Sequence, residues 1–168
     1  MRALRRRRLL ALPGALLALL PLAGCGFALR RAPELPFERI ALVGFSAQTE
    51  VAPELRRTLP AGVRVVVDPR DAEVVLEALV DQRRRSVAAM TAAGQVREVT
   101  LHSRLLYRLS TPGGRVLLPP AEVGFSRAMS YDEAAALAKA DEDRLLWRAM
   151  EADIAMQVLR RLAAAPPL

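Results

Sequence analysis

The segment 96–110 alternates apolar and polar residues more regularly than any other part of the chain. Successive side chains of a β-strand point to opposite faces, so this segment has one apolar and one polar face. Such a pattern is typical of an antiparallel strand in a sheet that is covered on one side only. The apolar face consists of Val99, Leu101, Leu105, Tyr107 and Leu109, and the polar face of Glu98, Thr100, His102, Arg104 and Arg108.

Two neighbouring segments extend the same sheet. Alternation over 72–90 predicts a second strand, and Ala92-Ala93-Gly94 supplies a turn between it and 96–110. After 110, Thr111-Pro112-Gly113-Gly114 predicts a hairpin turn into a third strand over 115–128. Pro119-Pro120 places that third strand at an edge, because proline has no N–H to donate to a neighbouring strand.

The segment 40–67 predicts a strand, a helix and a strand. The apolar run 40–45 favours a buried strand, and 63–67 favours another. Between them, 49–59 has helical periodicity, with Thr49 as the expected cap. A unit of this kind normally has parallel strands and a right-handed crossover.

A long helix is predicted from about 131 to 163. Ser130-Tyr131-Asp132-Glu133 has the pattern of a capping box at its start. Its apolar stripe consists of Leu146, Met150, Ile154, Val158 and Leu162, widened by Leu145, Ala149 and Leu159. The sequence therefore predicts an α+β fold, with two helices packed on one face of a mixed four- to five-stranded sheet.

The N-terminus has the pattern of an export signal. Five arginines lie within the first eight residues, the apolar run 9–20 follows, and Ala23 and Gly24 precede the only cysteine, Cys25. A helix of twelve residues spans about 18 Å, too short for a hydrocarbon core of about 30 Å. The alternative, an uncut signal anchor, would need a longer apolar segment.

Leu22-Ala23-Gly24-Cys25 resembles the lipobox of bacterial lipoproteins. The resemblance implies that residues 1–24 are a cleaved signal peptide and that Cys25 becomes a lipid-bearing N-terminus. Residues 25–38 are then a lipidated tether, and 39–165 form the α+β domain. The residue after the cysteine is Gly26 and not Asp, which by the sorting rule of such lipoproteins implies the outer membrane. Attachment to the membrane through this lipid anchor follows.

The net charge of +7 does not indicate a nucleic-acid partner. Five of the 25 basic residues lie in the signal, so its removal leaves 20 basic against 18 acidic residues. A nucleic-acid-binding domain would need a strongly basic face. The same composition leaves room for a local basic patch.

The sequence offers no convincing catalytic or metal site. His102 is the only histidine and is expected on the polar face of a strand, where an ordinary exposed residue is the simpler interpretation. The only cysteine is assigned to lipidation. We therefore predict that the chain is not an enzyme and needs no cofactor, apart from the covalent lipid on Cys25.

Three stretches together resemble the LptE family of lipopolysaccharide-assembly lipoproteins. They are Cys25-Gly26-Phe27-Ala28-Leu29-Arg30, the Gly94-Gln95 pair before the alternating strand, and Ala136-Leu137-Ala138-Lys139 followed by Glu142, Met150 and Arg160-Arg161-Leu162. The resemblance implies two helices against a four-stranded sheet. It also implies an outer-membrane complex in which the chain plugs its β-barrel partner LptD, assists assembly of the barrel, and binds lipopolysaccharide during transport to the outer leaflet.

The resemblance further implies a lipopolysaccharide-binding position at Lys139. A second basic position of the family falls near Thr91 or Ala92, which are not basic, so Arg83, Arg84, Arg85 and Arg97 are candidates to replace it. Cations beside apolar surface would suit the phosphates and acyl chains of lipid A. Two simpler interpretations stay open: Lys139 pairs with Glu142 or Asp143 along the helix, and the arginine run is a solvated strand end.

A rival interpretation comes from a different class of lipoprotein. A periplasmic lipoprotein adaptor of an inner-membrane lipid transporter would also have a lipobox and a small α+β domain. A structural lipoprotein without lipid cargo is a third interpretation. The partner distinguishes the LptE-like interpretation from the adaptor interpretation. The partner is a β-barrel in the first case and a transporter in the second.

Overall fold

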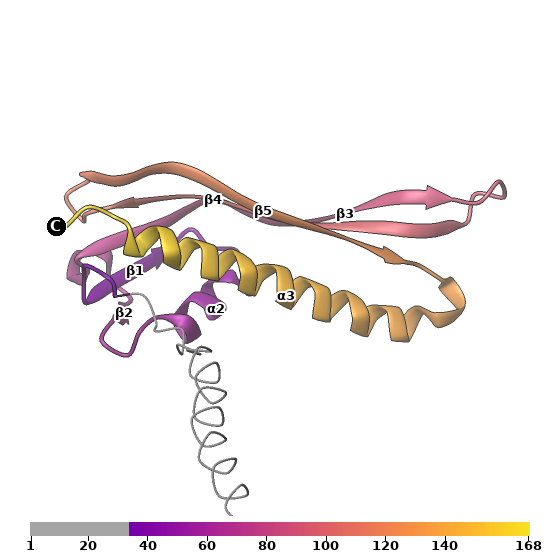
Figure 1. The fold of residues 1–168 in the computed structure, drawn as a ribbon, viewed down its shortest axis with the longest axis horizontal. Helices are drawn as coiled ribbons and strands as arrows, with labels where there is room; N and C mark the ends of the chain where they lie inside the picture. The colour runs from indigo at the N-terminus through magenta and orange to yellow at the C-terminus, as the bar shows by residue number, and fades with distance from the viewer. Residues whose placement is uncertain (1–33) are drawn as a thin grey trace, which may run out of the picture. The chain divides into compact units, whose positions relative to one another are not determined.

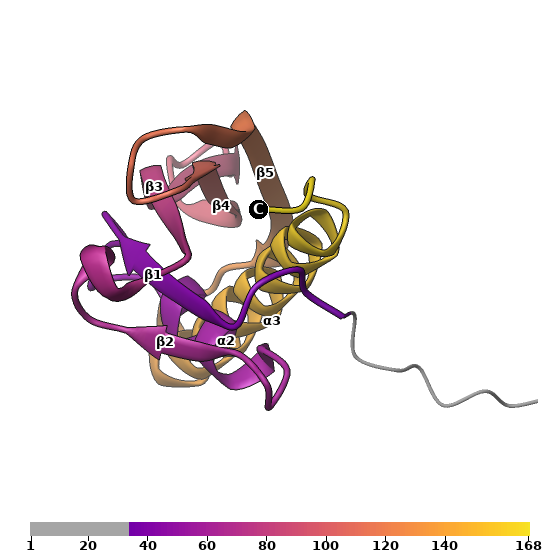
Figure 2. The same cartoon turned by 90° about the vertical axis from the view of Figure 1, so that its left-hand side faces the viewer.

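The computed structural model describes residues 34–168. Cys25, the predicted signal peptide 1–24 and the first part of the predicted tether 25–38 lie outside these residues. The described part contains two α-helices and a five-stranded mixed sheet, in the strand order β2-β1-β3-β4-β5. Both helices lie on one side of the sheet (Figures 1 and 2). This confirms the predicted α+β fold.

The first part of the sheet is parallel. β1 (Arg39–Val43) lies between β2 (Arg64–Val66) and β3, and both of these strands run parallel to it. The helix α2 (Val51–Thr58) connects β1 to β2, as expected for a strand–helix–strand unit. A short 3-10 helix, Pro69–Asp71, then leads into β3.

The second part of the sheet is a long antiparallel ribbon of three strands. β3 (Val74–Met90), β4 (Val96–Ser110) and β5 (Val116–Ser130) pair in that order, and β5 is the edge. Tyr107 pairs with Ala121 and Leu109 with Leu118, so β5 carries one extra residue opposite this step. The prolines 119 and 120 therefore lie in a bulge of an edge strand, which confirms the prediction from their missing N–H groups.

The long helix α3 (Ala136–Ala163) crosses the covered face of the ribbon, preceded by a 3-10 turn, Glu133–Ala135. We call the end of the sheet with β1, β2 and α2 the proximal end. The end with the turn 91–95 and the first turns of α3 is the distal end. In Figure 1, α3 starts at the distal end on the right and finishes at the proximal end on the left.

Two apolar clusters lie between the sheet and the helices. The proximal core includes Ile40, Leu55, Leu76, Tyr107, Ile154 and Val158. The distal core is smaller and consists of Val99, Leu101, Met129, Trp147 and Met150. The predicted stripe of α3 supplies residues to both, but Leu145 and Ala149 are exposed and do not widen it.

Both predicted helix caps were wrong. Thr49 is buried and donates its hydroxyl hydrogen bond to Asp81, and α2 begins after Glu50. The capping box was expected to start α3 near 131, yet Ser130 is the last residue of β5 and the helix cap is Ala135. In both cases a tertiary partner occupies the side chain that the local pattern assigned to the cap.

Gly44 is required where β1 leaves the sheet. Its φ is +76°, a conformation that side chains disfavour. A Cβ at this position would lie 2.4 Å from the carbonyl oxygen of Ala78, next to the bulge in β3 between Ala78 and Val80. Glycine thus permits the chain to turn from β1 towards α2 in close contact with β3.

Candidate functional site

The arginine run 83–85 does not form a single basic patch. Neighbouring strand residues alternate between faces, and the register pairs Arg83 with buried Ser103 but Arg84 with His102. Arg83 and Arg85 therefore lie on the face covered by α3, whereas Arg84 lies on the uncovered face. The structure separates three candidate residues that are adjacent in sequence.

On the covered face, strand arginines contact acids of α3. Arg85 forms an ion pair with Asp143, and Arg127 of β5 lies 4.0 Å from Asp153. The Arg83 guanidinium binds Glu151 through two hydrogen bonds, at 2.6 Å from Nε and 2.5 Å from Nη2. These contacts join β3 and β5 to the helix, so Arg83 and Arg85 already have acidic partners within the fold.

Glu151 is the centre of a buried polar cluster between the two apolar cores. Its side chain is 0% exposed, and it also accepts a hydrogen bond of 2.8 Å from the backbone N–H of Glu50. That amide belongs to the start of α2, so one carboxylate joins β3, α2 and α3. Arg83 also stacks over the Trp147 ring, 5.3 Å from its centroid. The hydrogen bond with Glu151 raises the pKa of Arg83 above its already high ordinary value.

Asp81 completes this polar cluster. One of its oxygens accepts hydrogen bonds from the Thr49 hydroxyl at 2.6 Å and the Ser46 amide at 3.0 Å. Burial raises the pKa of Asp81, and the hydrogen bond from Thr49 is the largest opposing effect. The cluster fixes the loop before α2 onto β3. It lies between the proximal and distal cores, which Phe125 of β5 also joins.

Lys139 and Arg97 lie at the distal end. The Lys139 ammonium donates hydrogen bonds to the Ser130 hydroxyl at 2.9 Å and to Glu142 at 2.8 Å. The amide of Tyr131, the next residue, binds the backbone carbonyl of Arg97 at 2.8 Å. The turn from β5 into α3 therefore brings these two candidate residues to the same end of the sheet.

Large apolar side chains are exposed at the distal end as well. Leu137, in the first turn of α3, is 88% exposed, and Val87 and Met90 at the end of β3 are 54% and 58% exposed. Together with Lys139 and Arg97, these side chains give the distal end both cationic and apolar groups. Figure 1 shows the end of β3 and the start of α3 at the same end of the sheet.

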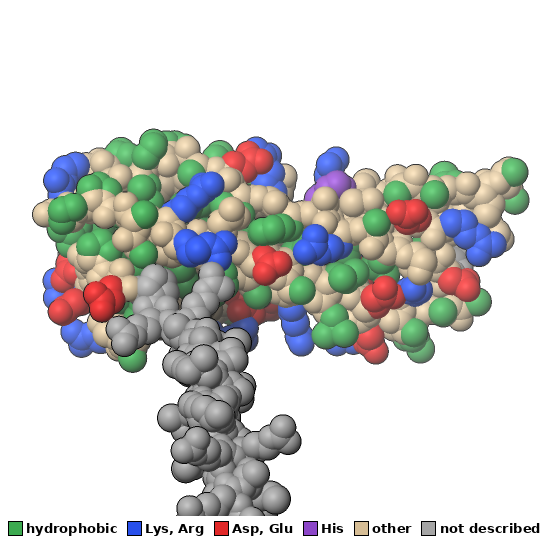
Figure 3. Space-filling view, viewed as in Figure 1, with side chains coloured by type: hydrophobic (Ala, Val, Ile, Leu, Met, Phe, Trp, Pro, Cys, Tyr) green, Lys and Arg blue, Asp and Glu red, His purple; other side chains and the backbone are tan. Residues whose placement is uncertain are grey.

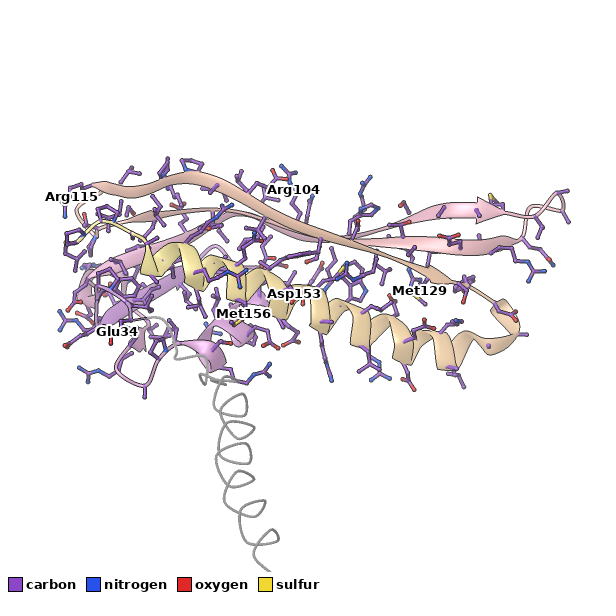
Figure 4. All side chains as sticks on the ribbon, viewed as in Figure 1. Glu34, Arg104, Arg115, Met129, Asp153 and Met156 are labelled. Carbon is purple, nitrogen blue, oxygen red and sulfur yellow. The ribbon has the colours of Figure 1, made fainter. Side chains whose placement is uncertain are left out.

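The uncovered face of the sheet is polar, as predicted from the alternation over 96–110. Ion pairs on it join Arg108 to Glu77 at 2.6 Å and Arg104 to Glu122 at 2.7 Å. Arg104 hydrogen-bonds to Glu122 and thereby lowers the pKa of that carboxyl. In Figure 4, Arg104 extends from the side of the sheet away from α3, whereas Met129 lies on the side towards it.

Glu151 and Trp147 were not predicted from the sequence as parts of the site. The sequence does contain a sign of this. Glu151 directly follows Met150 of the apolar stripe, and it lies four residues after the only tryptophan, which places both on one face of the helix. A carboxylate at the margin of a buried stripe requires a cationic partner, and Arg83 supplies it.

Within residues 34–168, no group of three His, Cys, Asp or Glu side chains is arranged to hold a metal ion. None of the helices in that range has a long enough apolar stretch to span a bilayer.

The fold is similar to those of solved bacterial lipoproteins. An uncharacterized lipoprotein B from Nitrosomonas europaea is 29% identical, with a TM-score of 0.67 over 83% of this chain and 91% of that one. A minor lipoprotein from Acinetobacter baumannii is 25% identical, with a TM-score of 0.64 over 80% and 98% of the two chains. Rare lipoprotein B from Shewanella oneidensis is 26% identical, with a TM-score of 0.60 over 76% and 95%. Comparison with curated proteins gives no match.

These similarities define the class as a small α+β domain of lipoprotein type. The model of the LptE family, described as lipopolysaccharide-assembly, matches residues 37–162 and so includes every strand, α2 and all but the last residue of α3. The chain belongs to the LptE family. This confirms the family resemblance drawn from the motifs in the sequence, and it places the chain in a family described by its part in lipopolysaccharide assembly.

Proposed function

We propose that the chain is an outer-membrane lipoprotein that takes part in lipopolysaccharide transport to the outer leaflet. In this proposal Cys25 carries the lipid anchor, and the domain plugs an LptD-like β-barrel and helps to assemble it. The family match over 37–162 is the observation that carries the proposal. The lipobox pattern and Gly26 support the location.

We further propose that the distal end binds lipopolysaccharide. Lipid A presents phosphates next to acyl chains, so a binding surface needs cations beside exposed apolar groups. Lys139 and Arg97 supply the cations, and Leu137, Val87 and Met90 supply the apolar surface. Lys139 pairs with Glu142 in the free domain, and a phosphate would replace or share that partner.

We leave Arg83 and Arg84 out of the proposed distal site. Arg83 is held by the buried carboxylate of Glu151, and Arg84 lies on the opposite face of the sheet. Arg85 stays a candidate, because its pair with Asp143 is as accessible as the pair between Lys139 and Glu142. Lys139 and Arg97 are the cations nearest the distal turn.

The Lys139→Glu variant tests the lipid site. We expect it to weaken lipopolysaccharide binding about tenfold, because one charge-assisted contact is replaced by repulsion. Arg148→Glu is the matched control, since Arg148 is exposed on the same helix and the charge change is identical. Equal binding by both variants, with unchanged circular dichroism, would remove Lys139 from the site.

The partner is tested by mild-detergent isolation of the C-terminally tagged chain from outer membranes. A co-purifying band whose gel mobility shifts on boiling is expected, because a folded β-barrel migrates differently from its unfolded form. Isolation of transporter subunits in its place would favour the inner-membrane adaptor interpretation. Isolation of the chain alone would leave only its lipoprotein class and family.

A further inference from the structure

The uncovered face of the sheet contains a hollow that none of the functions above explains. Its volume is about 480 Å³, and Gln82, Arg84, His102, Arg104, Gly124 and Ser126 line it, with Glu122 at its side. Figure 3 shows the histidine in purple beside a cationic side chain, next to a notch in the upper margin of the surface. The hollow is in the middle of the ribbon, away from the distal site.

The strand register arranges the residues that line this hollow in two rows. One row is Arg84, His102 and Ser126 on β3, β4 and β5, and the next is Gln82, Arg104 and Gly124. Neighbouring strands lie about 5 Å apart, so guanidinium, imidazole and hydroxyl groups face the same small volume. Gly124 adds no side chain to the second row.

Arg84 differs from the arginines of the covered face. Arg83, Arg85 and Arg127 each have an acid of α3 nearby. Among the side chains that the structure describes, Arg84 has no acidic partner. The one acid that lines the hollow, Glu122, is already paired with Arg104. Positive charge in the hollow therefore exceeds negative charge.

His102 is held in a defined orientation. Its Nε2 lies 3.0 Å from the Ser86 hydroxyl, so this nitrogen already has a partner and Nδ1 is left for another. Because the contact at Nε2 fixes the imidazole ring, Nδ1 is a preorganised hydrogen-bond donor when it carries a proton. A planar guanidinium next to it offers several donors in a fixed geometry.

We propose that this hollow binds a phosphate group. A phosphate has more acceptor oxygens than a carboxylate, and it matches donors that converge from three strands. The phosphate can be free or carried on a sugar or lipid headgroup, and the recognition chemistry is the same. The site requires neither lipopolysaccharide nor a barrel, so it stands independently of the proposed function.

The single histidine makes the test direct, because its ring protons report one site in the full chain. The full chain in detergent is titrated with inorganic phosphate and, separately, with glucose 1-phosphate, at constant ionic strength maintained with chloride. We expect saturable shifts of the His102 ring signals and of the amides of 82–86 and 122–126. Tighter binding of glucose 1-phosphate would identify a sugar-linked phosphate as the source, and equal binding would identify the phosphate group alone.

Two variants should move the affinity in opposite directions. Arg84→Gln should weaken phosphate binding about tenfold, since it removes a charged donor. Glu122→Gln should strengthen binding, since it removes the only acid of the lining. Arg115→Gln, an exposed arginine of the β4–β5 turn, is the control and should bind as the parent chain does.

The proposal is overturned if phosphate causes no saturable shift. It is also overturned if Arg84→Gln and Arg115→Gln bind phosphate equally, because the binding is then a general charge effect. A third contrary result is binding of a glutamate-rich peptide at Arg84 in the absence of phosphate binding. The hollow would then be a docking point for acidic protein side chains.

Discussion

The proximal and distal ends share one sheet and one helix but are held together differently. At the proximal end, α2 and α3 both cover the sheet, and Ile40, Leu76, Ile154 and Val158 are completely buried. At the distal end, α3 is the one element of residues 34–168 that covers the ribbon, and the core consists of five buried residues, one of which is Trp147. Apolar packing dominates the first end, whereas the second relies more on contacts between strand arginines and helix acids.

Because of this difference, the proximal end supplies most of the stability of the fold, and the distal end is free to bind a ligand. Regions with few buried apolar contacts open at lower free energy than a continuous core. Exposed ion pairs such as Arg85–Asp143 add little to the free energy of unfolding, because water and salt screen them. The distal end is therefore the part that can adjust to a ligand, while the proximal end serves as its scaffold. The Arg83–Glu151 pair is the boundary between the two.

The largest expected effect comes from breaking that boundary with Glu151→Ala. The change leaves Arg83 without its carboxylate partner and the Glu50 amide without its acceptor. We expect a loss of about 3–5 kcal/mol in the free energy of unfolding, measured by urea denaturation. Asp141→Ala removes an exposed carboxylate of the same helix and should change the free energy of unfolding little. Equal losses in both variants would contradict the boundary role.

Truncations of one buried side chain in each core should affect the molecule differently. Ile154→Ala should lower the global free energy of unfolding by about 2–5 kcal/mol, because it leaves a cavity in the proximal core. Met129→Ala should instead accelerate hydrogen exchange of amides 96–101, with little change in β1 and α2. If Met129→Ala accelerated exchange at both ends alike, the two cores would form a single cooperative unit.

A smaller effect is expected from Asp81→Asn, and it depends on pH. The folded state raises the pKa of Asp81 above 3.8, so it binds the proton more tightly than the unfolded state does. Stability from this group is therefore lost as the pH rises from about 4 through the raised pKa. Asparagine keeps an acceptor for Thr49 and Ser46 but does not ionise.

The measurement is the free energy of unfolding of both chains between about pH 4 and pH 7. The variant should gain stability relative to the parent chain as the pH rises. Parallel pH profiles would show that ionised Asp81 is not disfavoured in the fold.

The smallest expected effect is on the uncovered face. Arg104→Gln should raise the pKa of Glu122 back towards its ordinary value, because the hydrogen bond from Arg104 holds it low. A carboxyl-carbon NMR titration measures this directly. An unchanged pKa of Glu122 would mean that the pair does not persist in solution.

The sheet could be predicted because period-two patterns are local. The alternation over 96–110 located both faces of β4, and two prolines located the edge strand. The faces of Arg83 and Arg84 were harder to assign, since a bulge between Ala78 and Val80 shifts the alternation of β3. A pattern of residue types does not show where a strand gains an extra residue.

The helix starts and the buried acid could not be predicted, because distant residues determine them. Thr49 was expected to cap α2, but Asp81, 32 residues later, takes its hydroxyl. Ser130 was expected to start α3, but it ends β5 and accepts a hydrogen bond from Lys139. Glu151 is buried only because Arg83 lies opposite it in the folded chain.

Hydrogen exchange of the full chain with and without lipopolysaccharide tests the division between the two ends most directly. We expect slower exchange in 86–98 and 131–143 when the lipid is bound, and unchanged exchange in β1 and α2. Protection confined to β1 and α2, or no protection anywhere, would contradict a distal binding end supported by a proximal scaffold.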